Sequence, residues 1–371
     1  MVNTLQNKKF LDEIQYARAF AMLAVLCVHC TSTGLGSSPH ESFMFSIYNF
    51  FNVLGSLGVP TFIFLSGFIF FYSYYDKTLN AKLLKRFYVN RFTTILLPYL
   101  IFSLLYWVIK GYLYGMGDWQ SESKRIVYLL ATGKAHTHLY FVFITVQFYV
   151  LFPVLLYIFQ KFKFVRKYAI IHGILLQFLW VYLNSKYFQV EMKGSICFSY
   201  MMFYFIGAFF GIYYQQILEW TKDLKNSIAC ICSIFFGYGL SLCFYVGIIY
   251  LAKTKEFYLS NKWYELGWTM HGLFAGLVIF IIAHYAEIKF SIKVKRFFMG
   301  MGAASFGIYL IHPVVLMITR GILDSGTPIV FHSWQVISFL LSLFGSWAVV
   351  RFFYNYIPYS WVLFGKDSLK K

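Results

Sequence analysis

Long apolar runs alternate with short polar and basic segments along the whole chain. A run of about 20 apolar residues is long enough to cross the hydrocarbon core of a bilayer as an α-helix. The pattern therefore predicts an all-α polytopic integral membrane protein with about ten transmembrane helices, forming a single domain over residues 1–371. The predicted helices cover residues 14–32, 53–75, 92–113, 139–159, 168–183, 196–214, 227–250, 267–286, 297–319 and 333–355.

The composition excludes a soluble domain. Of the 371 residues, 60% are hydrophobic and 12% are charged, and the mean hydropathy is +0.63. A soluble domain carries roughly 25% charged residues. The net charge of +18 does not indicate a nucleic-acid partner, because the basic residues lie in the short segments between the apolar runs, where they face anionic lipid headgroups.

The distribution of basic residues predicts the orientation of the chain in the bilayer. With both termini in the cytoplasm, the inner segments hold roughly twice as many of the 32 lysines and arginines as the outer ones. Lys8 and Lys9 precede the first run as in a signal peptide. That run is long, contains Arg18 and lacks a small-residue cleavage site, so we interpret it as a retained helix.

Two polar residues mark the first run as the centre of the candidate site. Arg18 and His29 lie eleven residues apart. Eleven steps of about 100° return a helix to nearly the same face, with a rise of roughly 16 Å between the two side chains. A charged group inside the bilayer is costly and marks a site or a water-lined cavity. We expect Arg18 toward the cytoplasm and His29 toward the outside.

The positions of the acidic residues bear on which functions are compatible with the predicted helices. All 14 Asp and Glu residues fall in loops or at the ends of predicted helices, which disfavours an ion-coupled transporter. An imidazole can take a proton from a hydroxyl near neutral pH, as acyl transfer to an alcohol requires. His29 has no carboxylate within a predicted helix to orient it, and Glu41 in the following loop is the nearest candidate.

Two further residues in the inner half are candidates. Arg91 precedes Thr93, Thr94 and Pro98, which make the start of the third helix polar and prone to kink. Its guanidinium is suited to phosphates, so with Arg18 it is predicted to hold an anionic donor, although a plain topological anchor also explains it. Ser66 lies in a glycine- and proline-containing helix but lacks the Gly-x-Ser-x-Gly surroundings of a nucleophile.

Several other features are interpreted as structural. Cys27 and Cys30 form a Cys-x-x-Cys pair, but no second pair follows at zinc spacing, so we expect neither a metal nor a bound cofactor. The longest outer loop, roughly 114–138, is expected to cap the membrane interface with Trp119, His136 and His138. The Gly-x-x-x-Gly pattern at 207–211 predicts a close contact between helices.

Four segments together resemble the membrane-bound acyltransferase 3 family. The Arg18–His29 spacing is similar to its first-helix signature, and Ser305, Tyr309, Leu310 and His312 match its late Ser-x-x-x-Tyr-Leu-x-His motif. The segments that resemble the family are the first helix, LGVPTFIFLSGF at 57–68, HLYFVFITVQFYVLFP at 138–153 and ASFGIYLIHPVVL at 304–316. The resemblance extends over about residues 11–320.

The resemblance implies transfer of an acyl group from cytoplasmic acyl-CoA to a carbohydrate hydroxyl outside a bacterial cytoplasmic membrane. It implies that His29 is the catalytic histidine and that Arg18 and Arg91 lie near the donor. Acyl-CoA (acetyl-CoA or succinyl-CoA) is then a co-substrate rather than a bound cofactor. Motif residues without an assigned role are Ser66, Ser305, Tyr309 and His312.

Within the family, YFIGAFFG at 204–211 and the compact size look most like the branch linked to poly-N-acetylglucosamine adhesin. Members of that branch have been described both as polysaccharide exporters and as O-acyl (succinyl) transferases. Two positions depart from the family pattern. Gln15 stands where an acidic residue is common, and Arg91 lacks a second arginine three residues away.

The sequence thus predicts an integral-membrane O-acyltransferase acting on an extracytoplasmic polysaccharide or a lipid-linked glycan, with a glycan synthase as a candidate partner. The alternative is an exopolysaccharide export component without its own chemistry. The high aromatic content, 23%, favours that alternative because sugar faces stack on aromatic rings. Aromatic side chains are also ordinary on lipid-facing and interfacial helices, which weakens this support.

Overall fold

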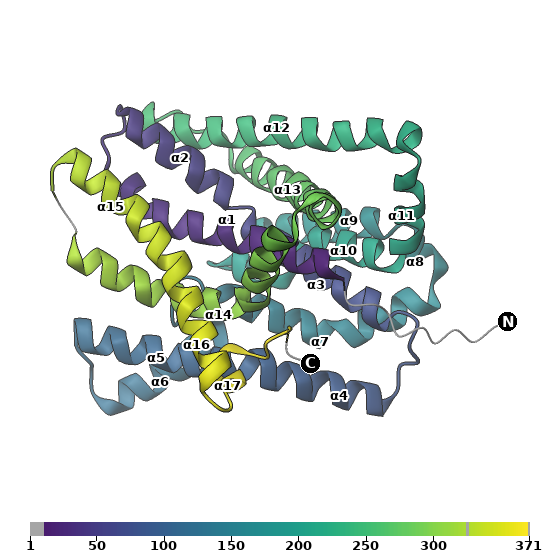
Figure 1. Ribbon diagram of the computed structural model, residues 1–371, viewed down its shortest axis with the longest axis horizontal. Helices are drawn as coiled ribbons and strands as arrows, with labels where there is room; N and C mark the ends of the chain where they lie inside the picture. The colour runs from purple at the N-terminus through teal and green to yellow at the C-terminus, as the bar shows by residue number, and fades with distance from the viewer. Residues whose placement is uncertain (1–10, 324–325, 370–371) are drawn as a thin grey trace.

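The computed structural model describes residues 11–323 and 326–369 and is all-helical over these residues (Figure 1). Eight helical segments in the described chain are long and apolar enough to cross a membrane. The all-α polytopic membrane class is thereby confirmed, while the orientation of the termini stays a prediction. Lys8 and Lys9 lie outside the described residues. The eight segments are α1 (Asp12–Ser37), α2–α3 (Phe43–Gly55 and Gly58–Tyr74), α4–α5 (Ala81–Arg91 and Leu97–Tyr114), α7 (Tyr140–Lys161), α12 (Leu224–Thr254), α13 (Asn261–Lys289), α14 (Ile292–Ile322) and α15–α16 (Pro328–Leu340 and Ser346–Tyr356).

The remaining two of the ten predicted runs are helical but differ from single long spans. The run at 196–214 forms a short 3₁₀ turn and α10 (Met201–Ile212), then bends by 73° into α11 (Tyr214–Lys222). The run at 168–183 forms α9 (Ala169–Leu183), whose 15 residues fall short of the roughly 20 that a straight span needs.

The second helical segment begins earlier than the sequence indicates. Ser42 starts α2, because its hydroxyl accepts a hydrogen bond from the Phe45 amide at 3.1 Å. The helix is interrupted at Ser56 and resumes as α3. The interruption leaves Ser56 on the wall of a cavity described below.

The predicted close contact at Gly207 is confirmed. A Cβ on Gly207 would lie 2.0 Å from the Phe64 carbonyl oxygen, and one on Gly67 would lie 2.2 Å from the Tyr204 carbonyl oxygen. Helices α3 and α10 therefore approach each other backbone to backbone, as small residues allow in membrane proteins. This contact lies in the larger of two buried clusters of apolar side chains.

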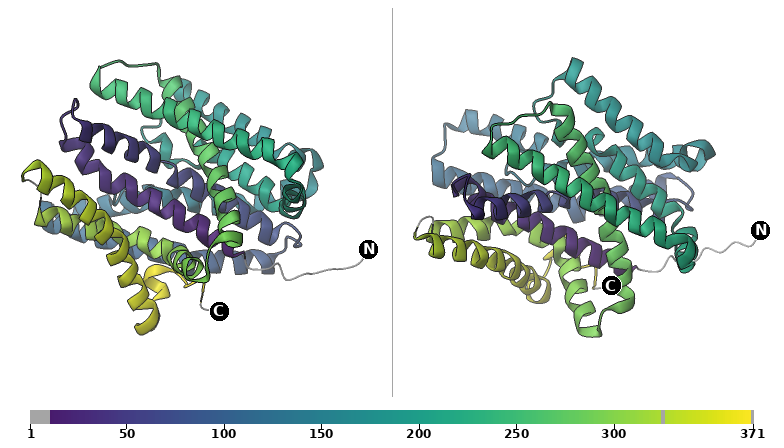
Figure 2. Two further views of the ribbon diagram at one scale, coloured as in Figure 1. Left: turned by 45° about the horizontal axis from the view of Figure 1, so that its top comes forward. Right: turned by 90° about the horizontal axis from the view of Figure 1, so that it is seen from above.

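Helix α1 lies inside the bundle, which explains how it carries polar groups. It packs against α2, α3, α13, α14 and α15, and it stays among the other helices in both further views (Figure 2). Helix α12 lies along one side of the bundle and α4–α7 along the opposite side (Figure 1). Arg18 and His29 therefore face protein and cavities rather than lipid acyl chains.

Candidate active site

Two cavities meet inside the bundle. The first, here called the histidine cavity, has a volume of about 590 Å³ and is lined by His29, His138 and Tyr309, with further residues of the 191–200 segment and α13. The second, here called the arginine cavity, has a volume of about 150 Å³ and is lined by Arg18 and Arg91. Tyr309 lines both cavities, so the cavities adjoin at this residue.

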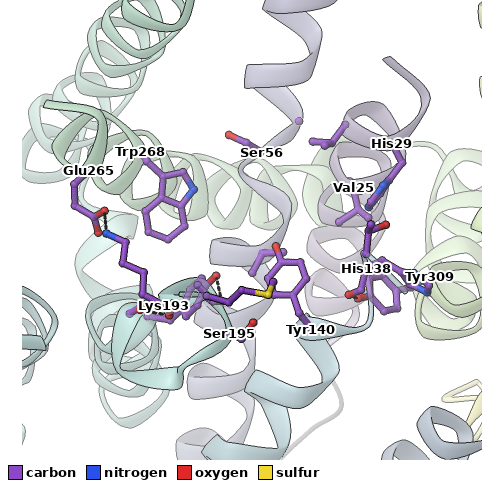
Figure 3. Close-up of a pocket in the computed structure, with 18 of the residues that line it drawn as sticks. Val25, His29, Ser56, His138, Tyr140, Lys193, Ser195, Glu265, Trp268 and Tyr309 are labelled. Atoms are coloured by element: carbon purple, nitrogen blue, oxygen red, sulfur yellow. Dashed lines mark hydrogen bonds and ion pairs between the residues drawn. The ribbon is translucent and has the colours of Figure 1, made fainter. Parts of the chain in front are cut away.

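Three imidazoles gather beside the histidine cavity, two of which, His29 and His138, line it. The ring centroid of His29 lies 5.1 Å from that of His312 and 6.4 Å from that of His138, and the latter two are 5.5 Å apart. Figure 3 shows His29, His138 and Tyr309 together on this side. In α14, Ser305, Tyr309 and His312 follow at spacings of four and three residues, so all three share one helix face.

Backbone hydrogen bonds fix these rings. Nδ1 of His312 lies 2.8 Å from the Tyr309 carbonyl oxygen, and since a carbonyl only accepts, Nδ1 carries the hydrogen. Nε2 of His312 is then the acceptor, and it is buried with no hydrogen-bond partner among the described residues. The Tyr309 hydroxyl donates to the His138 carbonyl, and the Tyr106 hydroxyl donates to the Leu310 carbonyl at 2.7 Å.

The neighbouring His136 and His138 lie in the loop between the helices. Their Nδ1 atoms are 2.9 Å apart. Burial, together with the positive charge of Lys110, lowers the pKa of His136 to about 4. Burial also lowers the pKa of His138 well below its usual range, with a smaller contribution from His312. Both imidazoles are therefore neutral at physiological pH.

The arginine cavity offers unpaired positive charge. No carboxylate of the described residues forms an ion pair with Arg18, whose guanidinium interacts electrostatically with Tyr354 and Tyr149. Arg91 stacks on Phe70 and Tyr149, with its guanidinium carbon 4.7 and 5.6 Å from the ring centroids, and its Nε is buried without a partner in the described chain. Two guanidiniums without a facing carboxylate, in the part of the chain described here, suit an anionic ligand.

The two serines in the same cavity differ. The Ser66 hydroxyl donates to the Phe62 carbonyl at 2.9 Å and is occupied by this helix hydrogen bond. Ser305 Oγ is buried and lacks a hydrogen-bond partner among the residues described. Ser305 is thus the serine free to contact a ligand in the arginine cavity.

The structure brings all the candidate residues to these two cavities. His29 and Tyr309 line the histidine cavity, and His312 contacts the His29 ring. The arginine cavity holds the remaining candidates, namely Arg18, Ser66, Arg91 and Ser305. Arg18 and His29 therefore open into adjoining cavities, both lined by Tyr309.

The sequence does not predict three residues of the site, namely His136, His138 and Arg320. From the sequence, His136 and His138 are expected to cap the membrane interface, but they lie in the site. The Tyr309 hydroxyl donates to the His138 carbonyl and holds this part of the loop inside the bundle. Glu41 makes no hydrogen bond or ion pair with His29 in the described chain. Arg320 donates to the His29 carbonyl at 2.7 Å. Its position eight residues after His312, on roughly the same side of α14, was the available signal.

Comparison with known proteins decides the family. A sequence model described as an acyltransferase domain, Acyl_transf_3, matches residues 11–351. The chain belongs to the acyltransferase 3 family. The match includes every candidate residue of the two cavities, and no solved structure matches the chain.

Curated relatives of the chain come from staphylococci. A protein of Staphylococcus aureus (strain Mu50 / ATCC 700699) is 24% identical over 321 residues, covering 83% of each chain. A protein of Staphylococcus epidermidis is 24% identical over 319 residues, covering 83% of this chain and 82% of the relative. Both relatives are named "Probable poly-beta-1,6-N-acetyl-D-glucosamine export protein".

Proposed function

We propose that this protein is an O-acyltransferase of the bacterial cytoplasmic membrane. It transfers an acetyl or succinyl group from cytoplasmic acyl-CoA to a hydroxyl of an extracytoplasmic polysaccharide or lipid-linked glycan. The observation that carries the proposal is the meeting of the arginine cavity and the histidine cavity at Tyr309. A site for an anion thus adjoins a cluster of imidazoles within one bundle.

The arginine cavity is the donor side of the proposal. Acyl-CoA carries phosphates, and guanidiniums bind phosphate oxygens with charge-assisted hydrogen bonds. Arg18 and Arg91 hold the anionic part of the donor, and the acyl thioester extends past Tyr309 toward His29. The basic residues of the neighbouring segment around α4 support entry of the donor from the cytoplasm.

The histidine cavity is the acceptor side. An imidazole nitrogen of His29 removes the proton from the acceptor hydroxyl as its oxygen attacks the thioester carbonyl carbon. The carbon–oxygen bond forms, the carbon–sulfur bond breaks, and the imidazolium returns the proton to the departing thiolate. His312 is the positioning residue of the proposal: its ring centroid lies 5.1 Å from that of His29, and its Nε2 is unpaired in the described chain. In the proposed reaction the His29 ring rotates so that its N–H donates to this Nε2, which takes the place of a carboxylate.

The experiment is acyl transfer by the full chain in nanodiscs. Labelled acetyl-CoA and succinyl-CoA are supplied with candidate glycans, and ester-linked label on the glycan is measured. Replacing a general base costs about 10²–10⁴-fold in rate, so His29→Ala loses at least about 100-fold. The control is His172→Ala, because His172 lies on α9 outside both cavities. Equal transfer by His29→Ala and the wild type contradicts the mechanism.

A second candidate function is export of an exopolysaccharide without chemistry, alone or with a glycan synthase. The observation that favours it is the printed name of the staphylococcal relatives. Export predicts that deletion of the gene traps polymer inside the cell and that His29→Ala has little effect. Acyl transfer predicts surface polymer that lacks ester-linked acyl groups in both strains.

A further inference from the structure

The wall of the histidine cavity opposite His29 is built from a tryptophan and an ion pair. Trp268 and Glu265 come from α13, and Lys193 comes from the segment between α9 and α10. Figure 3 shows these three side chains across the cavity from His29 and His138. The proton-transfer chemistry proposed for His29 does not use this wall, so it is free to hold the acceptor.

The segment that carries Lys193 is fixed in place. The Gln147 side chain donates to the Ser195 carbonyl at 2.7 Å and accepts from the Cys197 amide at 3.0 Å. The Tyr200 hydroxyl donates to the Gly194 carbonyl at 2.8 Å, and the Ser199 hydroxyl donates to the Lys193 carbonyl at 2.7 Å. Four hydrogen bonds therefore pre-organise a short loop beside the cavity.

The indole of Trp268 is held by other rings. Its centroid lies 5.6 Å from those of Tyr200 and Phe203, both in T-shaped contacts. Trp268 is half-buried and lines the histidine cavity. A fixed aromatic ring on a cavity wall offers an apolar platform for a flat ligand face.

The charges on this wall balance. Lys193 donates to Glu265, whose side chain is 16% exposed and thus shielded from water. At the rim, Lys134 lies 3.7 Å from Glu191. Ser195 is 6% exposed and lines the cavity, and its Oγ has no hydrogen-bond partner in the described chain. The wall presents donors and acceptors side by side without excess charge.

We infer that this wall is the acceptor subsite and that it selects an uncharged pyranose ring. The apolar face of the ring stacks on Trp268, and its hydroxyls donate to Glu265 and accept from Lys193. A hydroxyl group both donates and accepts hydrogen bonds, so it can contact Glu265 and Lys193 while they stay paired. A charged group on the sugar needs the opposite charge for itself and must therefore break the ion pair between Lys193 and Glu265. The inference rests on the proposed function and specifies the charge class of its acceptor.

The test is binding of three oligosaccharides by the full chain in nanodiscs, measured by calorimetry without any acyl donor. The tetramers are of N-acetylglucosamine (neutral), glucosamine (cationic) and galacturonic acid (anionic). The neutral tetramer binds at least about tenfold tighter than the other two. Trp268→Ala weakens this binding at least about tenfold, since a lost stacking contact of this kind is worth about one factor of ten in affinity.

Three more variants complete the test. Trp263→Ala is the matched control, because Trp263 lies on α13, is 48% exposed and does not line the cavity. Glu265→Gln leaves Lys193 unpaired, so binding shifts at least about fivefold toward the anionic tetramer, which a purely structural role of Glu265 does not produce. Trp268→Phe keeps a ring and retains part of the affinity.

The outcomes separate this inference from the proposed function. Equal binding of the three tetramers, no binding of any, or equal effects of Trp268→Ala and Trp263→Ala overturns the subsite, whatever the acyl transfer assay shows. Neutral-selective binding that depends on Trp268, together with no His29-dependent acyl transfer, sustains the subsite. The absence of His29-dependent acyl transfer overturns the enzymatic proposal in favour of export, and the wall is then a glycan-binding site of the exporter.

Discussion

Replacing Arg18 by methionine separates stability from donor binding. No carboxylate of the described residues pairs with Arg18, so no anionic side chain in the described chain neutralises its charge when the donor is absent. An arginine at the centre of a membrane helix costs about 2.5–3.5 kcal/mol by insertion scales. Arg18 lies near the start of α1 and opens into a cavity, and both features reduce that cost. We therefore expect Arg18→Met to raise the free energy of unfolding by about 1–2 kcal/mol.

The same change weakens donor binding. One charge-assisted hydrogen bond is worth about 1.5–3 kcal/mol, so the affinity for coenzyme A falls about 10- to 150-fold. At a concentration 100 times the dissociation constant, coenzyme A stabilises the wild type by about 2.7 kcal/mol. At that concentration the variant is stabilised by only about 0.3–1.4 kcal/mol.

The assay is thermal unfolding in nanodiscs with and without coenzyme A. Arg351→Met is the control, because Arg351 lies outside both cavities and pairs with Asp367 at 3.2 Å. It retains the full shift on adding coenzyme A. A less stable Arg18→Met protein with a wild-type response to coenzyme A refutes the reasoning.

Three further predictions follow from the packing and the loop histidines. Because the folded-state pKa of His136 is about 4, below the unfolded value of about 6.5, the unfolded state binds the extra proton between these values. The unfolding free energy falls as pH drops through this window, and a pH series of unfolding midpoints is flatter for His136→Gln. Gly207→Ala costs at least about 1–3 kcal/mol, since its Cβ would lie 2.0 Å from a backbone oxygen of α3, whereas Gly239→Ala meets nothing within 4 Å. Equal unfolding midpoints for these two variants contradict the close contact. Tyr309→Phe frees the His138 carbonyl, so acyl transfer falls about tenfold while the shift on adding coenzyme A stays. Loss of that shift instead places Tyr309 among the donor contacts.

The sequence predicts the fold class because the length and apolar character of each run indicate by themselves that it lies in a membrane. The energetic cost of Arg18 inside a helix likewise marks α1 as an interior helix before any packing is known. The short α9 matches the run predicted at 168–183, whereas the 73° bend after α10 is not visible in a hydropathy window.

The site is predicted only in part for the same reason. Arg18 and His29 share a face through helical periodicity, which is local. The inward position of His138 depends on a hydrogen bond from Tyr309, far away along the chain. The pairing of Lys193 with Glu265 also joins distant segments. No periodicity carries this information. The sequence offers only a carboxylate, Glu41, as a partner for His29, whereas the rings near His29 in the structure are the imidazoles of His312 and His138.

The most direct test of the two-cavity account is a sided transfer assay in sealed proteoliposomes of known orientation. Acyl-CoA is placed on the side of the basic loops and an impermeant glycan on the other side. The account predicts His29-dependent labelling of the glycan across the intact membrane and no labelling when both substrates are on the glycan side. Labelling only when donor and acceptor share one side contradicts it.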